Sequence, residues 1–296
     1  MTPADIIRQN SQPLEPLPTD TTPKTPVIEG IRAVLFDVYG TLFISASGDI
    51  SLTSGASRGD AAAEACEEAG LVLTCCVGDD IVAMLHDEIK RQHAASEYEY
   101  PEVDIHQVWR QVLARLPENG SIDYTLEDVE LERLAVEYET RVNPVWPMPG
   151  LVDCLAEIHS AGLTLGIVSN AQAFTRELFP ALGGKSLVEF GFADELCVWS
   201  YEHLQAKPGR WLYDRAAEAL ASRGIAPGET LYVGNDMRND VAPAAAVGFR
   251  TVLFAGDARS LRLREGDALV AGVVADAVVT DLRQILPILR LAPEAT

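Results

Sequence analysis

The sequence predicts a doubly wound α/β fold, in which helices cover both faces of a parallel sheet, together with an inserted helical domain. Short apolar runs rich in β-branched residues alternate with helical stretches from residue 31 onward. Near-continuous apolarity is typical of parallel strands buried on both faces, and the alternation is typical of doubly wound sheets. A mostly helical segment of about a hundred residues interrupts this alternation after the first strand, and it is long enough to form its own domain.

Three regions follow from this pattern. Residues 1–30 are rich in proline and threonine, so we expect a flexible N-terminal arm that buries little surface. Residues 31–43 and 149–296 form the expected core domain, and residues 44–148 form the expected helical cap domain. Within the insert, the Ser- and Gly-rich stretch 44–59 is compatible with a hinge that faces the substrate and equally with a solvent-exposed connector.

The core elements can be assigned in chain order. Each expected strand is a short apolar run that ends in small or polar residues. These runs are 32–37, 163–169, 229–234, 249–254 and 277–280. The expected core helices are 151–162, 173–182, 210–224 and 281–291. Gly162 and Gly224 stand where helices commonly stop, because glycine adopts the left-handed backbone conformation without steric cost.

Charge and hydropathy limit the partners that we expect. The chain has 44 acidic and 23 basic side chains, a formal net charge of −21. Nucleic-acid binding requires clustered lysine and arginine, so we expect no nucleic-acid partner. No apolar run approaches the roughly 18 residues that span a bilayer, and the N-terminus lacks the apolar stretch of a secretory signal. We therefore expect a cytoplasmic protein without a membrane partner. The sequence is compatible with a homodimer and with a monomer.

Cysteine usage indicates a structural role. The 5 cysteines are an odd number and show no CxxC spacing. This pattern favours reduced and mostly buried thiols over disulfides or zinc ligands.

Polar and charged side chains gather where predicted strands end. Ligands of open parallel sheets bind at the carboxyl ends of the strands, so these side chains are expected to form one site. They would supply a carboxylate nucleophile, a hydroxyl group, an amide, an ammonium group and two further carboxylates. The residues are Asp37, Ser169, Asn170, Lys207, Asp236 and Asp240. Each alone could equally cap a helix, stabilise a turn or lie in a solvated loop, so their order and strand context carry the prediction.

Four stretches, in order and on the expected elements, resemble the motifs of the haloacid dehalogenase (HAD) superfamily. They are "FDVYGTLF" (36–43), "IVSN" (167–170), "AKPG" (206–209) and "GNDMRND" (234–240). The resemblance covers roughly residues 31–43 and 149–285, and the helical insert stands where that superfamily carries its C1 cap. It implies a Rossmann-like HAD core with a helical cap, and hydrolase activity.

The resemblance also implies catalytic and substrate-binding roles. Asp37 would attack the substrate and form a covalent aspartyl intermediate. Lys207 would offset the clustered negative charge and keep that carboxylate ionised. Thr41, Ser169 and Asn170 would hold substrate oxygens or neighbouring carboxylates by hydrogen bonds. The substrate would be a small anion, which an acidic protein can bind only at a local site of opposite sign.

The resemblance implies a magnesium ion as cofactor. Asp37, Asp236 and Asp240 would bind or orient Mg²⁺, and the region of Tyr39 would add a backbone carbonyl. Mg²⁺ suits such a site because it binds few carboxylates and keeps several waters. Asp240 could instead act through Lys207 or through a metal-bound water.

Tyr39 departs from the pattern of the phosphatases in this superfamily, which usually carry an aspartate there as the general acid. A phenol has a reference pKa of about 10 and is a weak base near neutral pH, so the departure puts phosphatase activity in doubt. The 2-haloacid dehalogenases resemble the chain here, with an Asp-x-Tyr-Gly-Thr pattern. A halide leaves without a proton, and those enzymes need no metal. They commonly bind the substrate carboxylate through a cap arginine, for which Arg58, Arg91 and Arg110 are candidates.

The first and fourth motifs thus indicate different reactions. Adjacent carboxylates repel each other and favour a cation, so the pair Asp236 and Asp240 favours Mg²⁺-dependent hydrolysis of a small phosphorylated metabolite. The alternative is a metal-independent 2-haloacid dehalogenase, which Tyr39 favours. A third alternative is a HAD-fold binding protein without turnover, and the argument against it is the retention of Asp37, Lys207, Asp236 and Asp240.

Overall fold

A six-stranded parallel sheet forms the core in the computed structural model, which describes residues 1–45, 55–71, 78–116 and 130–291. The strand order is β5-β4-β1-β6-β7-β8, so β1 lies in the middle of the sheet. The strands are β1 (Ala33–Phe36), β4 (Thr164–Ser169), β5 (Phe192–Trp199), β6 (Thr230–Gly234), β7 (Arg250–Phe254) and β8 (Ala277–Val279). The predicted α/β fold with a parallel sheet is confirmed.

The five predicted strands all lie in this sheet, whereas the apolar pattern does not predict β5. Two exposed acidic residues, Asp194 and Glu195, interrupt the apolar run of this strand. They are tolerated because β5 is an edge strand that pairs only with β4 in the described sheet.

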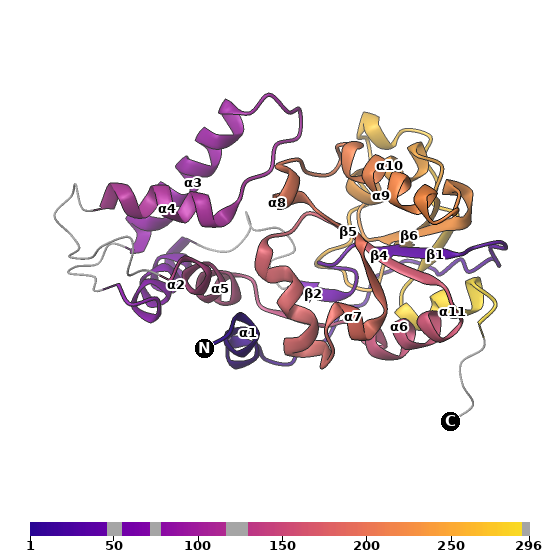
Figure 1. The fold of residues 1–296 in the computed structure, drawn as a ribbon, viewed down its shortest axis with the longest axis horizontal. Coiled ribbons are helices and arrows are strands. Elements are labelled where there is room, and N and C mark those ends of the chain that lie inside the picture. The colour runs from indigo at the N-terminus through magenta and orange to yellow at the C-terminus, as the bar shows by residue number, and fades with distance from the viewer. Residues whose placement is uncertain (46–54, 72–77, 117–129, 292–296) are drawn as a thin grey trace.

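Helices cover both faces of the sheet (Figure 1). On one face, Val34 and Phe36 of β1 pack in the same apolar cluster as α6 and α11. On the other face, Ala33 and Leu35 pack against α9 and α10, because successive side chains of a strand point to opposite faces. The core helices are α6 (Leu151–Ser160), α7 (Leu187–Phe190), α8 (Ser200–His203), α9 (Trp211–Ser222), α10 (Ala242–Ala246) and α11 (Ile285–Ile288).

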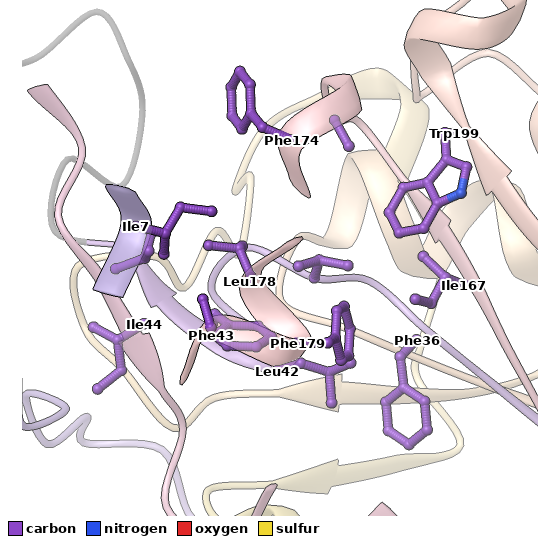
Figure 2. Packing of buried hydrophobic residues seen from close by; sticks show 14 of the residues in the cluster. Ile7, Phe36, Leu42, Phe43, Ile44, Ile167, Phe174, Leu178, Phe179 and Trp199 are labelled. Carbon is purple, nitrogen blue, oxygen red and sulfur yellow. The ribbon is translucent and has the colours of Figure 1, made fainter. Parts of the chain in front are cut away.

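The segment predicted as a helix at 173–182 has a different conformation. It forms a short 3₁₀ helix over Ala173–Glu177 and a wide π-type turn over Phe179–Gly183. Pro180 lacks the backbone N–H that a regular α-helix would need there, which accounts for the break. The turn places Phe179 edge-on against Phe43, with ring centroids 5.2 Å apart, inside the apolar cluster of Figure 2.

In the described part of the insert after β1, four helices form the cap. They are α2 (Gly55–Glu68), α3 (Gly78–Ala95), α4 (Ile105–Arg115) and α5 (Leu131–Val142). Trp109 of α4 meets Tyr138 of α5 edge-on, and both side chains are buried. The short antiparallel pair β2 (Phe43–Ser45) and β3 (Val145–Pro147) joins the cap to the core. The predicted hinge or connector at 44–59 lies largely outside the described residues.

The N-terminal arm buries more surface than its composition predicts. Residues Pro3–Asn10 form α1, which starts with a capping box between Thr2 and Asp5. Ile6 and Ile7 are each 1% exposed, because α1 packs against cap helix α5 and against the core segment 173–183. The expectation that this segment buries little is therefore wrong for α1, whose two adjacent isoleucines outweigh the proline-rich composition.

Two other sequence expectations can be compared with the structure. No helix of the described chain is long and apolar enough to cross a membrane. Cys66, Cys154 and Cys197 are buried free thiols, as predicted. Cys75 and Cys76 lie outside the described residues.

We expect Ile7→Ala to lower the free energy of unfolding by about 3 kcal/mol, because it removes a buried aliphatic side chain and leaves a cavity under α1. Urea denaturation monitored by circular dichroism measures the change. Leu17→Ala is the matched control in the same arm: Leu17 is 49% exposed, and its loss should change stability by less than about 0.5 kcal/mol. Equal effects of the two substitutions would contradict the docking of α1.

Candidate active site

A cavity of about 360 Å³ lies at the carboxyl ends of the core strands, where the core meets the cap. Side chains that follow β1, β4 and β6 contribute to its lining, together with side chains from the cap. Of the predicted site residues, the cavity brings together Asp37, Tyr39, Asn170, Lys207, Asp236 and Asp240.

Asp37 directly follows β1, and its backbone N–H donates to the carbonyl of Val233 at 2.9 Å, so the neighbouring strand fixes its position. The carboxylate is 6% exposed. Its Oδ1 accepts hydrogen bonds from Ser169 Oγ at 2.9 Å and from Lys207 Nζ at 2.6 Å. Oδ2 has no hydrogen-bond donor among the described residues, which leaves one oxygen of this carboxylate available to a substrate.

Lys207 places one buried ammonium group between two carboxylates. Its Nζ donates to Asp37 Oδ1 and, at 2.7 Å, to Asp240 Oδ1. Burial alone would lower the pKa of Lys207, but the two carboxylates outweigh burial and raise the pKa above its ordinary value. The lysine therefore stays charged.

Asn170 positions the loop that carries this lysine. Its Oδ1 accepts from the backbone N–H of Lys207 at 2.8 Å, and its Nδ2 donates to the backbone carbonyl of the same residue at 3.4 Å. Thr41 is fully buried and donates to Asn235 Oδ1 at 3.1 Å. Both residues were expected to hold substrate oxygens or neighbouring carboxylates. In the structure both have hydrogen bonds that hold the walls of the cavity, and Asn170 also lines it.

The turn after Asp37 requires glycine. Gly40 has φ +79°, and a Cβ there would lie 2.6 Å from Cβ of Ser260 and 2.8 Å from Nδ2 of Asn235. Glycine therefore allows the nucleophile loop to approach the loops that follow β6 and β7.

The predicted magnesium ligands do not form a fitting site as arranged. Asp240 accepts hydrogen bonds from Lys207, from Tyr232 Oη at 3.1 Å and from the backbone N–H of Asp236 at 2.9 Å. Asp236 accepts from Arg264 Nη2 at 2.6 Å and from two backbone N–H groups at the start of the next helical turn. The described residues contain no group of three acidic, cysteine or histidine side chains that could hold a metal. The chain's own cations thus engage the carboxylates that were assigned to Mg²⁺.

Burial also changes the proton affinity of this cluster. It raises the pKa of Asp240, and Lys207 opposes that effect. Burial likewise raises the pKa of Tyr39, and the nearby carboxylate of Glu139 adds to it. The Tyr39 hydroxyl is 3.0 Å from Thr175 Oγ1, with which it shares a hydrogen bond. Tyr39 is therefore a neutral phenol across the physiological range and does not act as a base.

The cavity contains residues that sequence reasoning missed. From the core these are Gln172, Asn235, Arg262 and Arg264, and from the cap Glu102 and Glu139. Asn235 stands within the "GNDMRND" motif, and the two arginines follow β7. Because residues that follow strand ends of a parallel sheet commonly line its ligand site, their positions in the sequence could have predicted this place. For the two glutamates the sequence contains no such signal, because the docking of the cap decides which of its residues face the core.

The cap arginines considered for substrate binding have other neighbours. Arg91 donates to Glu88 and Arg110 donates to Gln107, both on the cap surface and away from the cavity. Arg58 is buried in the cap, where its charge lowers the pKa of Glu139 in opposition to burial. The arginines that line the cavity come from the core instead.

Comparison with known proteins gives a family match over most of the chain. The model of the haloacid dehalogenase-like hydrolases matches residues 31–248. No curated protein matches the sequence.

Solved structures show the same fold at low identity. A 2-haloacid dehalogenase from Pseudomonas syringae pv. Tomato DC3000 is 21% identical, with 88% of this chain and 98% of that chain covered and a TM-score of 0.53. A HAD phosphatase from Thermococcus onnurineus is 20% identical, with 89% of this chain and 100% of that chain covered and a TM-score of 0.52.

We expect Lys207→Met to lower the free energy of unfolding by about 3–5 kcal/mol, because it leaves the buried Asp37 and Asp240 without their shared counter-ion. Chemical denaturation measures the loss. Adding Asp240→Asn to this variant should restore part of it, since one uncompensated charge is removed.

Lys90→Met is the matched control for this substitution. Lys90 pairs with Asp87 on the surface, where both side chains are more than two-thirds exposed. Its replacement should cost less than about 0.5 kcal/mol. A loss for Lys207→Met as small as that of the control would contradict the buried counter-ion role.

Proposed function

Because this chain belongs to the haloacid dehalogenase-like hydrolases, we propose that it hydrolyses a small organic anion through a covalent ester on Asp37, with a leaving group that needs no proton. A 2-haloacid is the substrate class that this chemistry favours. The observation that carries the proposal is the state of the three carboxylates. Asp37 has an oxygen without a donor among the described residues, while Lys207 and Arg264 neutralise Asp240 and Asp236.

The nucleophile is prepared for attack on carbon. Ser169 and Lys207 both bind Oδ1 of Asp37, so Oδ2 is left to approach the substrate. Attack by Oδ2 on the carbon that bears the halogen forms the ester bond and breaks the carbon–halogen bond, and the halide leaves with the bonding electron pair. Lys207 remains beside the ester to balance the charge of Asp240.

The absence of an aspartate at position 39 supports the same reaction class. A phosphate ester releases an alkoxide that needs a proton, whereas a halide is stable in water as it leaves. Tyr39 is bound to Thr175 and has a raised pKa, so it is a poor proton donor for an alcohol leaving group.

A core arginine supports an anionic substrate. Arg262 lines the cavity and brings positive charge to this part of a protein with a net charge of −21. Arg262 donates its Nη1 to the backbone carbonyls of Arg259 and Leu261, so the guanidinium is held at the wall. A carboxylate of the substrate would find its counter-charge there.

We expect halide release from chloroacetate or fluoroacetate to continue at an unchanged rate in EDTA, because no step of the proposed reaction uses a metal. Asp37→Asn should reduce turnover by at least about 1,000-fold, since the nucleophile is lost. Ion chromatography of chloride and fluoride measures both effects.

Asp87→Asn, at an exposed carboxylate of the cap surface, is the matched control and should keep the full rate. Assays of a phosphate-ester panel with added Mg²⁺ provide the opposing test. Phosphate release that depends on Mg²⁺ and on Asp37, without halide release, would overturn the proposal in favour of a phosphohydrolase.

We expect Tyr39→Phe to keep kcat within about tenfold, because the hydroxyl transfers no proton in the proposed reaction. The substitution removes the hydrogen bond to Thr175 and should lower stability by about 1 kcal/mol. Steady-state kinetics and thermal denaturation measure the two effects. A hundredfold loss of kcat in a stable variant would show that the phenol takes part in catalysis.

A further inference from the structure

Glu139 is a cap carboxylate at the same cavity as the nucleophile. It lies in the last turn of α5, close to where the cap returns to the core. Its side chain lines the cavity together with Asp37 and Tyr39, and its charge acts on the Tyr39 hydroxyl. Glu139 therefore faces the catalytic side of the cap.

Hydrogen bonds orient this carboxylate. Oε1 of Glu139 accepts from Asn143 Nδ2 at 3.0 Å, and Oδ1 of Asn143 accepts from Ser45 Oγ at 2.8 Å. Ser45 belongs to β2 and Asn143 follows α5, so the chain of hydrogen bonds runs across the junction between core and cap. Oε2 has no hydrogen-bond donor among the described residues, which leaves that oxygen to bind a water in the cavity.

Glu102 provides a contrast at the same cavity. Its Oε1 accepts from the backbone N–H of Val103 at 2.9 Å, and its Oε2 accepts from Ser200 Oγ at 2.7 Å. Oε2 thus holds the segment around residue 102 against the core, while Oε1 is bound within that segment. Glu139 alone of these two cap glutamates has an oxygen without a donor in the described structure.

The environment of Glu139 suits a group that exchanges protons. Burial raises its pKa, while the hydrogen bond from Asn143 and the charge of Arg58 on α2 oppose that effect. Tyr39 is the titratable group that faces it from the core, and it stays neutral. A carboxylate with a raised pKa is a stronger base than an exposed glutamate.

The proposed reaction leaves one proton transfer unassigned. The ester on Asp37 must be hydrolysed, and water is a weak nucleophile unless a base takes its proton. Asp240 and Asp236 are engaged by Lys207 and Arg264, and Tyr39 is not a base.

We propose that Glu139 is the general base that activates the water for hydrolysis of the Asp37 ester, an inference that rests on the proposed function. Oε2 takes one proton as the water oxygen attacks Cγ of Asp37. The bond between Cγ and the alkyl oxygen then breaks, and the protonated Glu139 returns its proton to that alkoxide. The hydroxy acid leaves, and Asp37 keeps an oxygen from water and releases the remaining proton to solvent.

Trapping the ester with chloroacetate tests this step. Rapid quenching and mass spectrometry of the peptide that carries Asp37 measure the ester, and chloride release measures the first step. For Glu139→Gln we expect a burst of about one chloride per enzyme, an accumulated ester, and steady-state turnover lowered by about 100-fold or more. Glu139→Asp should recover part of the turnover.

A pH profile supplies a second readout. In the wild type, turnover should fall on acidification, and the fall should start above the ordinary pKa of a glutamate because burial raises that of Glu139. Glu139→Gln should lose this limb. Glu132→Gln, at an exposed carboxylate of α5 outside the cavity, is the matched control: it should accumulate no ester and keep the limb.

Three outcomes would overturn the inference. If the wild type forms the ester and Glu139→Gln turns over at the wild-type rate, another base acts and only this inference fails. If Glu139→Gln loses the chloride burst itself, its role is structural. If the wild type forms no ester and releases no chloride, the proposed function fails and the general-base role falls with it.

Discussion

The ammonium group of Lys207 between Asp37 and Asp240 is the interaction on which the cavity depends. A parallel sheet brings the carboxyl ends of β1 and β6 together, and here both ends deliver carboxylates into a buried space. Such a cluster in a strongly acidic protein is stable only with an internal cation, and the loop before α9 supplies it. Asn170 binds both backbone polar groups of this lysine, so the cation is fixed through its main chain as well as its side chain. Arg264 performs the same neutralisation for Asp236 from another loop.

The sequence predicts the site residues at the ends of the core strands better than those of the long loops and the cap. The sequence alone predicts that three residues lie close together: Asp37, Lys207 and Asp240. The reason is that the carboxyl ends of parallel strands meet at one edge of a sheet, regardless of the conformation of the loops. The pairing of Arg264 with Asp236 could not be predicted, since it depends on the path of a loop that pairing rules do not describe. That pairing is what turns the expected magnesium ligands into neutralised wall residues. Glu139 was missed for a related reason. Packing over the whole surface of the helical cap decides how it docks on the core, and the apolar pattern of a single helix does not show which of its residues will face the cavity.

Core and cap contribute different chemistry to the cavity. The core supplies Asp37, whose Oδ1 accepts from Ser169 and Lys207 and whose Oδ2 has no donor among the described residues. The cap adds two glutamates to the cavity, and burial there raises the pKa of Glu139. Solved structures of similar fold include both a phosphatase and a dehalogenase, so the fold alone does not determine the reaction.

The docked N-terminal helix has a mechanical consequence. α1 contacts α5 of the cap and the core segment 173–183, and Asn10 donates to Glu137 and Thr140 on α5. Any rotation of the cap away from the core must therefore slide or strip this helix from one of its two neighbours. Residues Pro3–Asn10 thus join the cap to the core at a second place, in addition to the paired strands β2 and β3.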